Sequence, residues 1–102
     1  MPYGSWINDL PTAFFMVVHI AAFALGAGFA WLAYKRALSV LSVAFSLFAV
    51  AELVYMTYHL DWTVFLFAHT IAEVLDLSAF VLVFAAAVYS TLRRPALGTT
   101  RA

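Results

Sequence analysis

Six ionisable side chains interrupt the apolar stretches of this sequence, where such groups are seldom found. They are His19, Glu52, His59, His69, Glu73 and Asp76. Imidazole and carboxylate groups can hold a metal, ligate haem or pass protons, and inside an apolar span each is a functional hypothesis by default. We therefore expect the chemistry of the chain at these six positions.

The spacing of the last five of these residues places them on helical stripes. His69, Glu73 and Asp76 follow one another at i, i+4 and i+7, so they share one face of a helix. Glu52 and His59 stand seven residues apart and share a face of another helix. Each pattern predicts a polar stripe that faces protein rather than lipid.

His19 belongs to a third stripe, which is otherwise built of small residues. Ala22, Gly26 and Ala30 continue its face, and small residues at this spacing let helices approach closely. His19 is thus predicted to point at the other helices. Counted from one end of each span, His19, Glu52 and His69 lie at a similar depth, which predicts one intramembrane cluster.

Two cofactors are compatible with these residue types, a first-row transition metal and haem b. A metal such as iron or zinc would be held by His19, Glu52, His69 and Glu73. Alternatively, His19 and His69 could be the two axial ligands of haem b. The residue pattern leaves both cofactors open.

A proton path is the third chemistry, and it needs no cofactor. A ladder of four groups leads inward from one membrane face: His59, His69, Glu73 and Asp76. Below Asp76 the sequence is apolar from Phe80 to Ala85, so the ladder is predicted to stop halfway. Without any such chemistry, the same groups could simply join helices by hydrogen bonds, each of which contributes about 0.6 kcal/mol to helix association.

Three helices must position these groups. The chain is 67% hydrophobic and only 10% charged, whereas soluble domains are near half and one quarter, so its surface requires lipid. Apolar runs predict helices at about 12–34, 38–60 and 63–92, each long enough to cross the hydrocarbon core. Residues of about 95–102 are predicted to form a disordered tail. The expected fold class is an all-α integral membrane bundle of three transmembrane helices, forming a single domain over 1–102.

The charged residues predict the orientation of this bundle. All the basic residues fall on one side of a three-span arrangement: Lys35, Arg36, Arg93, Arg94 and Arg101. The other side carries Asp9 and Asp61. Because basic loops stay in the cytoplasm, we expect a multi-pass protein of the cell membrane with its N-terminus outside and its C-terminus in the cytoplasm.

Composition also excludes several classes of function. The net charge is zero, which provides no basic surface for nucleic acid, and the absence of cysteine excludes disulfides and thiolate sites. The sequence has no nucleophile triad and no phosphate-binding loop. We expect the chain not to be catalytic on its own.

Two stretches, ALGAGFAWLAYKR and LSVAFSLFAVAELV, are followed by a third apolar span. In this arrangement the chain resembles small three-helix membrane proteins of archaea that have no assigned function. The resemblance covers most of the chain and implies the fold alone. It implies no site residues.

Partners are expected because three short-looped helices bury little surface by themselves. These partners would be membrane lipid together with other membrane subunits or further copies of the chain. The leading hypothesis is a small accessory subunit of a respiratory or redox membrane complex, whose cluster handles a metal, haem or protons. The alternatives are a stand-alone homo-oligomeric haem- or metal-binding protein and a purely structural packing subunit.

Overall fold

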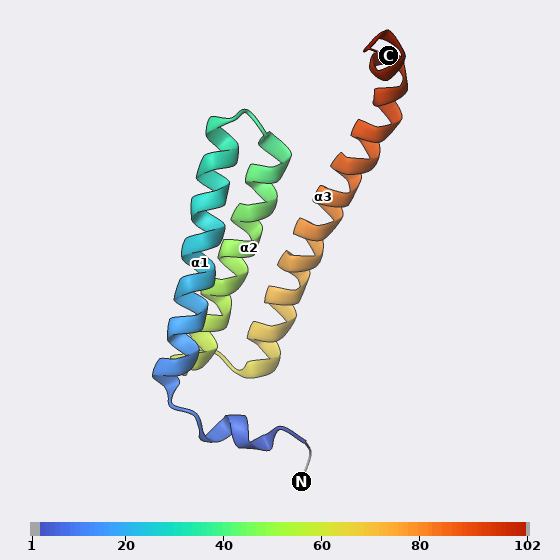
Figure 1. Cartoon of the computed structure of the whole chain (residues 1–102). Helices are drawn as coiled ribbons and strands as arrows, with labels where there is room; N and C mark the ends of the chain where they lie inside the picture. The colour runs from blue at the N-terminus through green and yellow to red at the C-terminus, as the bar shows by residue number, and fades with distance from the viewer. Residues whose placement is uncertain (1–2, 102) are drawn as a thin grey trace.

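A computed structural model describes the backbone of residues 3–101 and the side chains of residues 3–93. A short 3-10 helix, η1 (Ser5–Asp9), precedes three α-helices, namely α1 (Thr12–Lys35), α2 (Ser39–His59) and α3 (Phe65–Arg101). The expected all-α fold with three long helices is confirmed. Figure 1 shows α1 and α2 side by side, with α3 on the other side of α2. Within the described residues the backbones of α1 and α3 do not come together, so α2 is the centre of the fold.

All three helices are long and apolar enough to cross a membrane, over Thr12–Lys35, Ser39–His59 and Phe65–Arg93. Their large apolar side chains mostly point outward, as those of Trp31, Leu66 and Phe80 do. The buried hydrophobic residues are nearly all small: Ala30, Ala33, Ala44, Ala49, Ala51, Met56, Ala68, Ala72 and Ala79. Small residues inside and large apolar residues outside are the pattern expected in lipid, and they suggest a membrane-spanning protein.

The closest approach of α1 to α2 is at Gly26. A Cβ atom added there would lie 2.8 Å from Cδ2 of Phe48 and 3.3 Å from Cβ of Ala49. Ala30, one turn further along α1, is also buried. The small-residue face predicted on α1 is therefore the face that packs against α2.

α1 and α2 end with the same type of C-terminal cap. In each cap, a residue other than glycine adopts the left-handed backbone conformation. Ala37 has a φ of 60° after α1, and Asp61 has a φ of 64° after α2. After α1, the amide of Leu38 donates to the carbonyl of Ala33 at 2.8 Å. The amide of Ala37 donates to the carbonyl of Tyr34 at 3.1 Å, and α2 ends with the corresponding pair of bonds. This is the Schellman motif, in which glycine is the preferred left-handed residue.

Replacing Ala37 with glycine should stabilise the protein. A left-handed conformation costs an L-residue with a Cβ about 1 kcal/mol, and glycine avoids that cost. The free energy of unfolding, measured by titration with a denaturing detergent, should rise by about 1 kcal/mol. Ala27→Gly is the control, because the same change at this exposed position inside α1 should lower stability by about 1 kcal/mol. A lower stability for Ala37→Gly would show that Ala37 does not adopt the left-handed conformation in this turn.

The α-helices cover Thr12–Lys35, Ser39–His59 and Phe65–Arg101, where the sequence predicted helices at about 12–34, 38–60 and 63–92. The backbone of α3 is helical as far as Arg101, through the segment predicted to be a disordered tail at about 95–102. Extending an existing helix needs no new nucleation, so residues after Arg93 can continue it. At the other end, η1 was not predicted, and Figure 1 shows it at the end of the bundle where α2 turns into α3.

Candidate functional site

One stripe of α2 runs along the open side between α1 and α3. Its residues, Phe45, Phe48, Glu52, Tyr55 and His59, recur at alternate spacings of three and four, which keeps them on one face. Because the backbones of α1 and α3 flank α2 without coming together, this face is not covered by a third helix within the described residues. We call it the central groove. Two cavities, both lined by residues of this stripe, lie along it.

A histidine–carboxylate pair joins α1 to α2 in the middle of the groove. Nδ1 of His19 is hydrogen-bonded to Oε2 of Glu52, within ion-pair distance. The two side chains are only 17% and 12% exposed. The structure thus brings together two of the residues that the sequence placed at similar depth on separate helices.

Stacked rings hold His19 in place. The ring centroids of His19 and Tyr55 are 5.3 Å apart, and those of His19 and His59 are 5.1 Å apart. His59 stacks in turn on Phe15, with centroids 4.8 Å apart and planes 5° from parallel. These four rings come alternately from α1 and α2, so they form an interlocked column. A side chain fixed on both faces keeps its hydrogen-bonding nitrogen in one direction.

Tyr55 connects this column to the carboxylates of α3. It lies within electrostatic reach of Glu52, of Asp76 and of Glu73, whose side chain is exposed. Asp76 is also within electrostatic reach of Glu52 and Glu73. We call His19, Glu52, His59, Glu73 and Asp76 the polar cluster. The sequence patterns did not identify Tyr55 as a neighbour of this cluster. Its place three residues after Glu52 and four before His59 is the signal that could have done so.

Asp76, at the inner end of the polar cluster, has a carboxylate oxygen that lacks a hydrogen-bond partner among the described residues. This oxygen is Oδ1, and it is buried. An unpaired buried oxygen is costly, so it needs a proton, a water molecule or a donor from a ligand. The Asp76 carboxylate is therefore a group at which an exchangeable proton would be stabilised.

His69 lies on α3, apart from His19. Its ring stacks on Phe65 with centroids 5.2 Å apart, and Phe65 meets Tyr58 of α2 edge-on at 5.3 Å. No interaction joins His69 to His19 in the part of the chain that the structure describes. The two imidazoles each have partners on their own side of the groove.

The fit of a metal or haem can be judged from these donors. Among residues 3–93, no group of three or more histidine and acidic side chains is arranged to hold a metal ion. First-row metals in proteins usually take at least three such ligands. The metal ligands predicted at His19, Glu52, His69 and Glu73, and the haem ligands predicted at His19 and His69, stay predictions. The pair that the structure does form, His19 with Glu52, suits proton transfer.

The cavity nearer the N-terminus is mixed in character and has a volume of about 420 Å³. Residues of η1, of the following turn and of all three helices line it: Ile7, Asn8, Leu10, Thr12, Phe15, His19, Tyr55, Tyr58, His59, Asp61 and Phe65. We call it the polar cavity. His19 and His59 open onto it, so the polar cluster is accessible from this end of the bundle.

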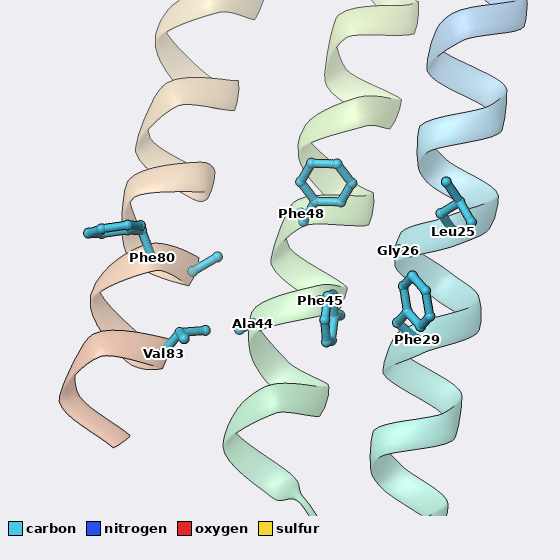
Figure 2. A pocket seen from close by; sticks show the side chains of 9 residues that line it. Leu25, Gly26, Phe29, Ala44, Phe45, Phe48, Phe80 and Val83 are labelled. Atoms are coloured by element: carbon cyan, nitrogen blue, oxygen red, sulfur yellow. The ribbon is translucent and has the colours of Figure 1, made fainter. Parts of the chain in front are cut away.

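The second cavity begins where the polar cluster ends and has a volume of about 370 Å³. Only apolar residues line it: Leu25, Gly26, Phe29, Ala44, Phe45, Phe48, Ala79, Phe80 and Val83. Figure 2 shows this apolar cavity with Phe45 and Phe29 adjacent between α2 and α1, and Val83 turned from α3 toward α2. The apolar boundary that the sequence placed at Phe80 is thus part of the wall of a cavity.

Similarity to other proteins contributes nothing to the assignment of this site. Comparison of the chain with protein-family models, with curated proteins and with solved structures gave no match. The resemblance to small archaeal three-helix membrane proteins therefore stays a prediction. The functional argument depends on the polar cluster and the two cavities beside it.

Proposed function

We propose that this chain is a small proton-handling subunit of a respiratory or redox complex in the cell membrane. It spans the membrane three times, with its N-terminus outside and its C-terminus in the cytoplasm. Its cluster carries protons from the outer surface to Asp76 and hands them to a partner or a bound molecule. The His19–Glu52 pair between α1 and α2 is the observation on which the proposal depends.

The proposed route passes through neighbouring groups that accept and release protons. It begins at the polar cavity, which His59 and His19 line. From His19 a proton reaches Glu52 through their hydrogen bond. Tyr55 then links Glu52 to Glu73, and Asp76 is the last group. Intramembrane relays use this kind of alternation of imidazole, carboxylate and hydroxyl groups.

The route crosses only part of the membrane, because no histidine, acidic or basic residue follows Asp76 on α3 before Arg93. The apolar cavity lies directly beyond Asp76. Protons can therefore arrive at Asp76 from one side only, and a group supplied by a partner or ligand must take them away.

The charge distribution supports the orientation. Lys35 and Arg36 lie at the turn between α1 and α2, and Arg93 lies toward the C-terminal end of α3. Figure 1 shows η1 at the end of the bundle opposite the α1–α2 turn, and residues of η1 line the polar cavity. The positive-inside rule puts the basic end in the cytoplasm, so the polar cavity opens outward.

One-sided protonation of Asp76 tests the proposal. Uniformly oriented vesicles containing the protein are subjected to a pH jump on one side, and the infrared band of the Asp76 carboxyl, assigned with Asp76→Asn, is followed in time. A drop in pH on the N-terminal side should change the band quickly, while the same drop on the C-terminal side should not. Glu52→Gln should slow the response by about 100-fold, the usual effect of removing a positioned proton-transfer group.

The control is Asp9→Asn, because Asp9 is exposed and lies outside both cavities, and its response should equal that of the wild type. Equal responses from both sides, or an unaffected Glu52→Gln variant, would refute the proposal. A slow response in His69→Gln but not in Glu52→Gln would place the route on α3 alone, through His69, Glu73 and Asp76.

A further inference from the structure

We propose that the central groove binds a quinone, with its ring in the polar cavity and its isoprenoid tail in the apolar cavity. This inference goes beyond the proposed function and includes no transfer of protons or electrons to the bound ring. Binding itself is argued from the two cavities, and it can be measured separately.

The polar cavity has the shape and chemistry of a site for a flat ring. Phe15, Tyr58 and Phe65 supply aromatic faces, while His19 and His59 supply donors for carbonyl oxygens. Its volume of about 420 Å³ falls within the usual range for small-molecule sites. Imidazoles can also accept hydrogen bonds, so the cavity can hold both the quinone and the quinol form.

Charge decides between a neutral and an anionic head group. The residues that line the polar cavity include no lysine or arginine. The basic residues Lys35, Arg36 and Arg93 are at the opposite end of the bundle. A phospholipid head group would therefore find no cation for its phosphate, whereas the carbonyls of a neutral quinone need only hydrogen-bond donors.

The apolar cavity provides a place for the tail of the same molecule. It shares the stripe of α2 with the polar cavity, since Phe48 lies one turn before Glu52 and Tyr55 follows Glu52. Its walls carry aromatic and aliphatic side chains from all three helices, as Figure 2 shows. Because the backbones of α1 and α3 stay apart, a tail can enter sideways from lipid instead of being threaded from one end.

The experiment measures binding of decylubiquinone, a neutral quinone with a ten-carbon tail, to the full chain in lipid nanodiscs by calorimetric titration. Saturable binding of one quinone per chain is expected. The same ring with a methyl group in place of the tail should bind at least about tenfold more weakly, and decanol should not compete. Non-saturable partitioning of decylubiquinone, equal to that into empty nanodiscs, would overturn the inference.

Matched variants test each cavity. Phe65→Ala should weaken decylubiquinone binding about tenfold, whereas Phe67→Ala should not, although the two rings are 51% and 55% exposed. Val83→Trp should fill the apolar cavity and reduce binding to the level of the tailless ring. Val81→Trp should have no effect, because Val81 does not line that cavity. Equal losses within either pair would refute the assigned positions, and circular dichroism checks that each variant remains helical.

Failure of this inference can be separated from failure of the proposed function. Loss of proton delivery in Glu52→Gln with no quinone binding in the wild type would overturn the quinone site and leave the proton path. Saturable quinone binding together with two-sided or absent protonation of Asp76 would overturn the path and leave the site. Displacement of bound quinone by an anionic phospholipid at equal concentration would overturn the charge argument.

Discussion

Replacing Glu52 with leucine should destabilise the folded protein by about 3 kcal/mol. The substitution leaves the imidazole of His19 without its carboxylate while the column of rings still holds it in the groove. A buried polar group that loses its partner costs more than the bond itself contributed. The reverse change, His19→Leu, should cost a similar amount because it leaves the Glu52 carboxylate unpaired.

The double variant, with leucine at both positions, separates the His19–Glu52 interaction energy from the effects of the single substitutions. No polar group of the pair is left unpaired, so the double variant should be more stable than the sum of the single effects predicts. The coupling energy should be about 1–3 kcal/mol, measured by titration with a denaturing detergent in bicelles. Ser46→Leu is the control on the same helix, because Ser46 is exposed and its hydroxyl donates to the carbonyl of Ser42 one turn back. Additive single effects would mean that His19 and Glu52 do not interact in the membrane.

The polar stripes could be predicted from sequence because they follow from helical periodicity. Once His69, Glu73 and Asp76 are known to lie on one helix, their spacing fixes their common face. The meeting of His19 with Glu52 also follows, since equal depth and short turns leave few other partners. What periodicity cannot provide is the angle between helices. The divergence of α3 from α1, which separates His69 from His19, is determined by packing along the whole of α2.

Features that depend on short-range geometry could not be predicted from the sequence patterns either. The left-handed caps at Ala37 and Asp61 lack the glycine that normally marks them. The 3-10 helix η1 matters because it closes one side of the polar cavity, yet its segment is too short to show a periodicity. Spacing alone does not assign a polar role to Tyr55, because an aromatic residue in an apolar helix is ordinary. Its electrostatic proximity to Glu73 gives it a role.

Gly26→Leu should be the most damaging substitution on α1. A Cβ atom at this position already lies 2.8 Å from the ring of Phe48, 3.3 Å from Cβ of Ala49 and 3.4 Å from Cα of Ala49. The Phe48 ring can turn into the apolar cavity to accommodate one methyl group, so Gly26→Ala should cost little. The backbone at Ala49 cannot move in that way, and leucine must push α1 away from α2. Overpacking of this kind should lower the free energy of unfolding by about 3 kcal/mol.

Gly28 provides the matched control two residues further along α1. Nothing lies within 4 Å of a Cβ atom added there, so Gly28→Leu should change stability by no more than about 0.5 kcal/mol, or raise it slightly through better helix propensity. Because His19 lies two turns from Gly26 on the same stripe, separation of α1 from α2 should also break the His19–Glu52 bond. Gly26→Leu should therefore abolish one-sided protonation of Asp76, which Gly28→Leu should leave intact. Full proton delivery in a Gly26→Leu protein that has lost stability would show that the path does not depend on contact between the first two helices.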